Sequence, residues 1–165
     1  MYEFYENKNV FPHAFLIGEY RVIKDSEKIK ELMFSTNFDL RKEAILESDP
    51  GIVKTQGNMG EAKIVSYKSN NIAISVNARE KSLLFLAENY YPGWHATIDG
   101  KNTPILRADY VFRAIPVEEG QHMISFYYEP WSFKLGVYIS IGGMITILLF
   151  TLISRNINRR KSISS

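Results

Sequence analysis

The chain contains 165 residues, of which 45% are hydrophobic and 13% aromatic, and its formal net charge is +2. All 18 acidic residues precede residue 132, whereas five of the 20 basic residues follow it. The net charge is therefore the average of two unlike parts, which excludes a uniformly basic surface for nucleic acid. No cysteine is present, so the fold has to be stable without disulfide bonds.

Residues 1–60 predict a small α/β segment that enters the following domain and ends in a loop. Its two short apolar stretches, FPHAFLIG and EYRVI, are typical of edge strands. Asp25 is a candidate N-cap for a short helix from Ser26 to about Phe34, and residues 44–46 predict another short strand. Residues 48–60 hold three glycines and one proline, which favours a loop.

Residues 61–131 predict a mainly β fold, because apolar residues recur at every second position from Glu61 onward. Short strands alternate with turn residues, which favours an antiparallel sandwich of two sheets with about seven strands. Leu83–Ala87 is continuously apolar, as expected of a strand that is buried on both faces. The strongest hairpin turn signal is Asp99-Gly100.

Residues 132–154 predict one C-terminal transmembrane helix, because the segment from Leu135 to Ile153 carries no charge. As a helix, Phe133 to Ile153 would extend roughly 31 Å, close to the hydrocarbon thickness of a bilayer. A chain of this size is too small to enclose such a helix in a soluble core. Small residues that share one face favour packing against neighbouring membrane helices: Ser132, Gly136, Ser140 and Gly143.

The sequence also predicts how the helix is oriented in the membrane. Residues 155–165 contain the basic cluster Arg155, Arg159, Arg160 and Lys161. Such clusters stay in the cytoplasm, so we expect residues 61–131 to form an extracytoplasmic domain. Residues 1–10 have neither the basic start nor the apolar run of a signal peptide. We therefore expect the C-terminal piece of a longer membrane protein, with a tail-anchored protein whose domain is cytoplasmic as the alternative.

A long, ordered set of positions lies between residues 88 and 133. It comprises Tyr91-Pro92-Gly93-Trp94, Asp99-Gly100-Lys101, Tyr110 with Phe112-Arg113-Ala114, and Gly120 with His122. This set resembles the C-terminal ectodomain and last helix of the YfhO-type bacterial membrane proteins, which are relatives of the GT-C glycosyltransferases. Residues 3–23 also resemble the segment that enters this ectodomain.

The resemblance implies a multi-spanning enzyme that moves sugars from a polyprenyl-phosphate carrier to cell-surface polymers such as teichoic acids. The catalytic acids of GT-C enzymes lie in loops between early membrane helices, which this chain does not contain. We therefore expect a non-catalytic extracytoplasmic domain with the last membrane helix, and no cofactor. The expected partners are the lipid bilayer, the preceding transmembrane helices, and a cell-surface glycan or polyprenyl-phosphate sugar.

Two other functions remain open at this stage. One is a membrane-anchored β-sandwich module that binds a glycan or a partner protein. The other is a structural lid over neighbouring membrane helices. Tyr90, Tyr91 and Trp94 are the candidate glycan contacts, since flat aromatic faces suit sugar rings. The alternative for Trp94 is a place in the core of the sandwich.

One buried charge is also predicted. Arg113 alternates in phase with Ile115, so we expect it to point inward and to form a structural ion pair. Asp109 is the predicted partner, and Asp99 is the other carboxylate considered. No metal site is predicted, because His13, His95 and His122 are far apart and lack ligand spacing.

Overall fold

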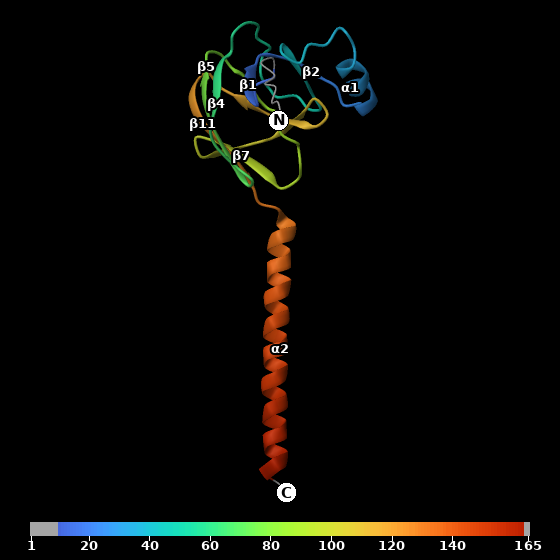
Figure 1. Ribbon diagram of the computed structural model, residues 1–165, viewed down its shortest axis with the longest axis vertical. Coiled ribbons are helices and arrows are strands. Elements are labelled where there is room, and N and C mark those ends of the chain that lie inside the picture. Colours follow the sequence, from blue (N-terminus) through green and yellow to red (C-terminus); the bar gives the residue numbers. More distant parts are fainter. Residues whose placement is uncertain (1–9, 164–165) are drawn as a thin grey trace, which may run out of the picture. The chain divides into compact units, whose positions relative to one another are not determined.

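The computed structural model describes residues 10–163, with side chains as far as Leu152. The chain divides into two compact units, Met1–Tyr128 and Glu129–Ser165. The elements of the first unit are β1 (Ala14–Ile17), β2 (Glu19–Val22), α1 (Ser26–Met33), β3 (Glu43–Leu46), β4 (Gly60–Lys68), β5 (Asn71–Ala78), β6 (Ser82–Leu86), β7 (Trp94–Ile98), β8 (Lys101–Thr103), β9 (Leu106–Ala108), β10 (Phe112–Val117) and β11 (Gly120–Tyr128). The second unit holds α2 (Trp131–Ile163) (Figure 1).

The first unit is mainly β, and its strands form two sheets, as the sequence predicts. One sheet has six strands in the order β1-β6-β10-β9-β3-β2, and the other has five in the order β4-β5-β11-β7-β8. Within residues 10–163 this gives more strands than the seven or so predicted. All strand pairs are antiparallel except β2 with β3, which is parallel.

The additional strands come partly from the segment that we expected to precede the sandwich. β1 pairs with β6, placing Ala14 beside Leu86, and β3 pairs with β9, placing Leu46 beside Ala108. Ala14 and Leu46 are buried in these positions. The predicted boundary at residue 60 therefore does not separate two folded units, because the six-stranded sheet draws on both sides of it.

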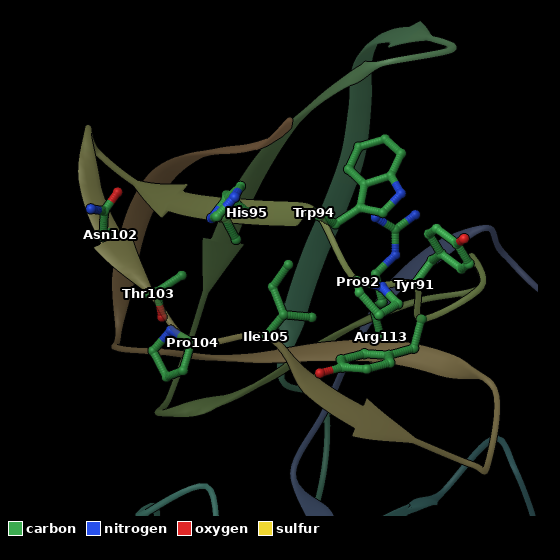
Figure 2. Close-up of a pocket in the computed structure, with 12 residues that line it drawn as sticks. Tyr91, Pro92, Trp94, His95, Asn102, Thr103, Pro104, Ile105 and Arg113 are labelled. Carbon is green, nitrogen blue, oxygen red and sulfur yellow. The ribbon is translucent and has the colours of Figure 1, made fainter. Parts of the chain in front are cut away.

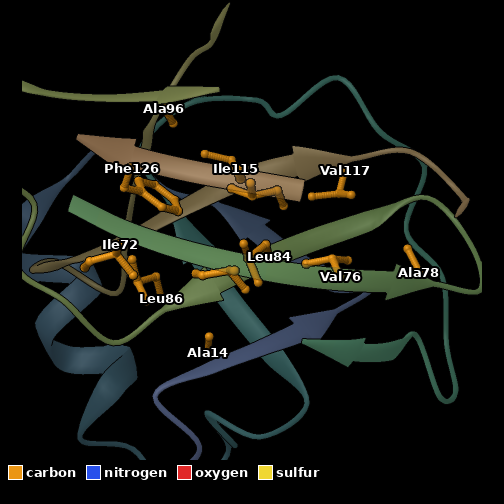
Figure 3. Packing of buried hydrophobic residues seen from close by; sticks show 12 residues of the cluster. Ala14, Ile72, Val76, Ala78, Leu84, Leu86, Ala96, Ile115, Val117 and Phe126 are labelled. Atoms are coloured by element: carbon orange, nitrogen blue, oxygen red, sulfur yellow. The ribbon is translucent and has the colours of Figure 1, made fainter. Parts of the chain in front are cut away.

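The core lies between the two sheets, where side chains from both inner faces meet (Figure 3). Ile74, Leu84, Ile115, Ile124 and Phe126 are completely buried there. β6 is buried along its whole length, as predicted, because its other face belongs to a second cluster. In that cluster Leu83 and Phe85 of β6 pack with residues from the first part of the chain, such as Tyr20 and Ile52.

Two local predictions are confirmed in detail. The carboxylate of Asp25 accepts hydrogen bonds from the backbone N–H groups of Glu27 and Lys28 at 3.0 and 3.4 Å, which caps α1. β7 and β8 form the hairpin predicted from Asp99-Gly100. Both turn residues have left-handed backbone conformations, with φ of 50° and 79°, which is the pattern of a type I′ turn.

In the second unit, Trp131–Leu152 is long and apolar enough to cross a membrane. This confirms the predicted C-terminal helix, although α2 continues to Ile163 as a helix beyond the apolar part. The small residues Ser132, Gly136, Ser140 and Gly143 are exposed on α2. At 100° per residue they share one face, and their predicted role in helix packing remains a prediction. The side chains of Arg155, Arg159, Arg160 and Lys161 lie outside the described residues.

Candidate functional site

A pocket of about 350 Å³ lies beside β7 and β8, at one edge of the five-stranded sheet (Figure 2). Its lining residues come from the segment before β7, from β7 itself, from β8 and the β8–β9 connection, and from the start of β10: Tyr90, Tyr91, Pro92, Gly93, Trp94, His95, Ala96, Asn102, Thr103, Pro104, Ile105 and Arg113. Pockets of this size accommodate small molecules. The resemblance motif around Trp94 therefore borders a real cavity of the fold.

The aromatic residues reach the pocket from the connection between β6 and β7. Gly93 has φ of 101°, a conformation that side-chain-bearing residues rarely adopt, and this bend leads into β7. The N–H of Tyr90 donates to the carbonyl of Val111 at 2.6 Å, which ties the connection to the start of β10. Tyr91 is 62% exposed, whereas Trp94 is half-buried with its ring centre 5.5 Å from that of Tyr128.

The structure thus brings all three predicted glycan contacts to one pocket. It also packs Trp94 against the core cluster between the sheets. The two interpretations of this tryptophan, sugar contact and core residue, are therefore compatible with a single position. A binding role for Tyr90, Tyr91 and Trp94 remains a prediction.

Arg113 lies deep in the same place and is only 1% exposed. Its Cζ atom is 4.2 Å from the centre of the Trp94 ring and 5.5 Å from that of Phe126, so aromatic faces cover the guanidinium. Nη2 lies 3.6 Å from Oε2 of Glu88. Nε and Nη1 have no hydrogen-bond partner within the described part of the chain. Burial lowers the pKa of Arg113, and the charge of Glu88 opposes that effect.

The predicted ion pair between Asp109 and Arg113 is not the one observed. Arg113 points inward as predicted, but its carboxylate partner is Glu88. Asp109 lies in the turn between β9 and β10 with φ of 44°, where the N–H of Ile45 donates to its Oδ1 at 2.7 Å. The turn thus directs this carboxylate to the backbone of β3. Asp99, the other carboxylate considered, pairs with His122.

Sequence reasoning missed Glu88, which connects four separate segments. Its Oε1 lies 2.8 Å from Nε2 of His13 and accepts a hydrogen bond from the hydroxyl of Tyr67. Its Oε2 faces Arg113. The hydrogen bond to Glu88 raises the pKa of Tyr67. The only sequence signal is an acid two residues after the buried strand β6 and before the aromatic run.

The three histidines occupy different environments. His13 contacts Glu88, the ring of His95 stacks on that of Tyr127 at 5.3 Å, and His122 pairs with Asp99. Among the residues that the structure describes, no group of three or more potential ligands has the arrangement of a metal site.

Comparison with known proteins relates the chain to a family of bacterial membrane proteins. Residues 53–140, more than half of the chain, match the protein family described as "Bacterial membrane protein YfhO". The "Uncharacterized protein YfhO" of Bacillus subtilis (strain 168) is 25% identical over 116 residues. This alignment covers 68% of the chain and 14% of the relative, so the chain spans only a small part of the relative's length. No solved structure matches significantly.

Proposed function

The chain belongs to the YfhO family of bacterial membrane proteins, and we propose that it forms the extracytoplasmic domain and last membrane helix of a larger glycosyltransferase. In this proposal the larger protein moves sugars from a polyprenyl-phosphate carrier to a cell-surface polymer such as teichoic acid. The sequence resemblance to the GT-C relatives supports the activity. The chain itself supplies no catalytic residue and acts by binding or positioning.

The observation that carries this proposal is the extent of the family match. It runs from the loop before β4, through every strand of the five-stranded sheet, into α2 as far as residue 140. The part of the sandwich from β4 onward and the start of the apolar helix are therefore parts of one family unit, and β1, β2 and β3 precede the match. The relative is much longer than this chain, which is consistent with a protein that holds further membrane helices and the catalytic loops.

The charge distribution supports an extracytoplasmic sandwich. Four basic residues follow the apolar segment within ten residues, and only Lys134 lies close to its other end. Lys and Arg near helix ends are retained in the cytoplasm. The sandwich and its pocket then face the side of the membrane on which surface polymers are found.

Labelling of introduced cysteines tests this topology, and the chain is suited to it because it contains no cysteine. Ser75→Cys lies on an exposed position of β5, and Ser162→Cys lies in the basic tail. Both are made in the protein at its natural length, in a background without other cysteines. We expect an impermeant maleimide to label Ser75→Cys in intact cells and Ser162→Cys only after permeabilisation. The reverse pattern contradicts the proposal.

The transferase activity needs a separate experiment. Deletion of the gene in its own bacterium should remove a sugar substituent from the purified surface polymers, as measured by NMR. Reintroducing the intact gene should restore it. Unchanged polymers in the deletion strain would refute the glycosyltransferase function.

A membrane-anchored module that binds a glycan or partner protein is the second candidate, and the aromatic pocket favours it. Such a module binds its ligand without any change in the sugar content of the polymers. The deletion experiment therefore distinguishes the two functions.

A further inference from the structure

We propose that the pocket binds a phosphorylated sugar, with the phosphate at Arg113 and the sugar ring against Tyr91 and Trp94. The inference deepens the proposed function and rests on it for the choice of phosphate over other anionic groups. Two sources of this chemistry are the polyprenyl-phosphate donor and a phosphate-containing surface polymer.

Arg113 has buried N–H donors that lack a hydrogen-bond partner within the described residues. A guanidinium carries five N–H donors, and burying them without partners is unfavourable. Glu88 balances the charge, but its Oε2 lies 3.6 Å from Nη2, beyond normal hydrogen-bond distance. The other carboxylate oxygen is engaged by His13 and Tyr67. Nε and Nη1 therefore remain to be satisfied by something outside the described residues.

The position of Trp94 does not block these donors. The indole ring lies over Arg113, with Cζ 4.2 Å from its centre. Stacking uses the flat face of a guanidinium, whereas its hydrogen bonds lie in the plane of the group. Tyr91 lines the same pocket as Arg113 and is exposed, so its side chain can move aside for a ligand without disturbing the core.

An oxyanion fits this arrangement better than a neutral group. Charge-assisted hydrogen bonds from Arg to phosphate or carboxylate are about twice as strong as neutral ones. The rest of the pocket suits a sugar, because Tyr91 and Trp94 offer aromatic faces and Asn102 and Thr103 offer polar groups for hydroxyls. A volume of about 350 Å³ has room for one sugar ring with its phosphate.

Binding is tested on the whole chain in detergent micelles. The chain has two tryptophans, so Trp131→Phe leaves Trp94 as a single fluorescent reporter in the pocket. The probes are glucose 1-phosphate, glucose and inorganic phosphate. We expect glucose 1-phosphate to change the Trp94 emission saturably, with an affinity at least about tenfold higher than that of glucose. Added salt should weaken this preference, because it rests on charge.

Two variants assign the preference to the proposed residues. Arg113→Lys keeps the charge but removes the planar donor arrangement, so it should lose most of the phosphate preference. Tyr91→Ala changes an exposed side chain, so the domain should stay folded. This variant should weaken the binding of both glucose and glucose 1-phosphate. Phe34→Ala, an exposed aromatic substitution outside the pocket lining, is the matched control and should bind like the parent.

The source of the phosphate is resolved by two further probes, a polyprenyl-phosphate-linked glucose and glycosylated glycerol-phosphate oligomers, compared at equal concentration. Equal binding of glucose and glucose 1-phosphate, or unaltered preference in Arg113→Lys, would overturn the inference. Failure of this inference is distinguishable from failure of the transferase function. Probe binding with unchanged polymers on gene deletion upholds the site alone, whereas lost polymer sugars without probe binding uphold the transferase alone.

Discussion

The Nδ1 atom of His122 lies 2.7 Å from Oδ2 of Asp99 and links the β7–β8 turn to strand β11. Oδ1 of the same carboxylate accepts a hydrogen bond from the N–H of Met123 at 2.8 Å. The N–H of Asp99 in turn donates to the carbonyl of Met123 at 2.9 Å. Asp99 therefore fixes the β7–β8 turn to strand β11 through both its carboxylate and its backbone N–H.

The pair predicts a specific pH dependence of stability. The hydrogen bond to Asp99 raises the pKa of His122, while burial opposes this effect, and the hydrogen bond to His122 lowers the pKa of Asp99. Because folding raises the pKa of His122 above an unfolded value of about 6.5, its stabilising effect is complete below that pH. The effect is lost as the pH rises through the folded pKa.

We therefore expect His122→Gln to lower the Tm of the domain more at pH 6 than at pH 9. Thermal unfolding followed by circular dichroism at several pH values measures this difference. Gln121→Ser, at an exposed neighbouring position, controls for disturbance of the strand and should follow the parent at every pH. If His122→Gln lowers the Tm by the same amount at every pH, the ion pair between His122 and Asp99 does not contribute to the stability of the domain.

Asp109 predicts a pH dependence in the acidic range. Burial raises its pKa to about 6, and its Oδ2 has no hydrogen-bond partner within the described residues. Folding thus favours the protonated acid, so this group makes the parent lose stability as the pH rises from about 4 to about 6. Asp109→Asn should remove this contribution to the pH dependence of the free energy of unfolding, whose slope is at most roughly 1.4 kcal/mol per pH unit.

Chemical denaturation at pH 4, 5 and 6 measures the slope for Asp109→Asn and the parent. Asparagine tolerates the left-handed conformation of this turn, so the backbone should not be strained. Glu61→Gln, which removes an exposed acid on β4, should leave the slope unchanged. Parallel slopes for Asp109→Asn and the parent would contradict the assignment.

Local signals in the sequence predicted much of this fold. The Asp25 cap, the Asp99-Gly100 turn and the apolar run of β6 are each decided by residues close in sequence. The short strands β1, β2 and β3 were predicted, but their place in the six-stranded sheet was not, because β1 and β3 pair with strands that are distant in sequence. The turn at Asp109 and Tyr110 has two left-handed residues and no glycine, so it gave no turn signal.

Two glycines with positive φ, one at the start of β4 and one in the β7–β8 turn, provide a third prediction with a matched control. Gly60 and Gly100 both have positive φ, of 111° and 79°. A Cβ at Gly60 would overlap the carbonyl oxygen of Asn77, whereas a Cβ at Gly100 meets nothing within 4 Å. Gly100→Ala should therefore cost only about 1 kcal/mol of conformational strain.

Gly60→Ala should cost clearly more than Gly100→Ala, because β4 must move away from β5 to accept the methyl group. Urea denaturation of both variants gives the comparison. Equal losses of stability would mean that backbone conformation alone, and not the close approach of β4 to Asn77, requires glycine at position 60.

Trp94 should contribute to stability less than a fully buried aromatic. Phe126 is completely buried, so Phe126→Ala is expected to cost roughly 3–5 kcal/mol. Trp94 is half-buried and covers Arg113, so Trp94→Ala is expected to cost about 2–3 kcal/mol. Denaturant unfolding of the two variants measures the order. A Trp94→Ala domain as stable as the parent would leave sugar binding as the reason for this residue.

The candidate site was predictable only in part. Tyr90, Tyr91 and Trp94 are neighbours in sequence, so their common location follows from one short segment. The partner of Arg113 was wrongly predicted, because proximity in sequence favoured Asp109 over Glu88. Pairing of β10 with β6 places Arg113 opposite Leu86, two residues before Glu88, and no local pattern encodes that register.

The small-residue face of α2 gives the last prediction. Ser132, Gly136, Ser140 and Gly143 lie within about 80° around the helix axis. In the protein at its natural length, Gly136→Leu should prevent close approach of a neighbouring helix and reduce the amount of assembled protein in the membrane. Gly142→Leu is the matched control, because this glycine lies about 120° away from the centre of the face.

A Cβ at either glycine meets no atom within 4 Å in the described residues, so neither substitution disturbs α2 itself. Any difference between the two variants therefore reports on what packs against the helix. Assembly is measured as the yield and monodispersity of the detergent-extracted protein, with Ser140→Leu as a second variant on the same face. If Gly136→Leu and Ser140→Leu behave like Gly142→Leu, the face contacts lipid, and the helix acts only as an anchor.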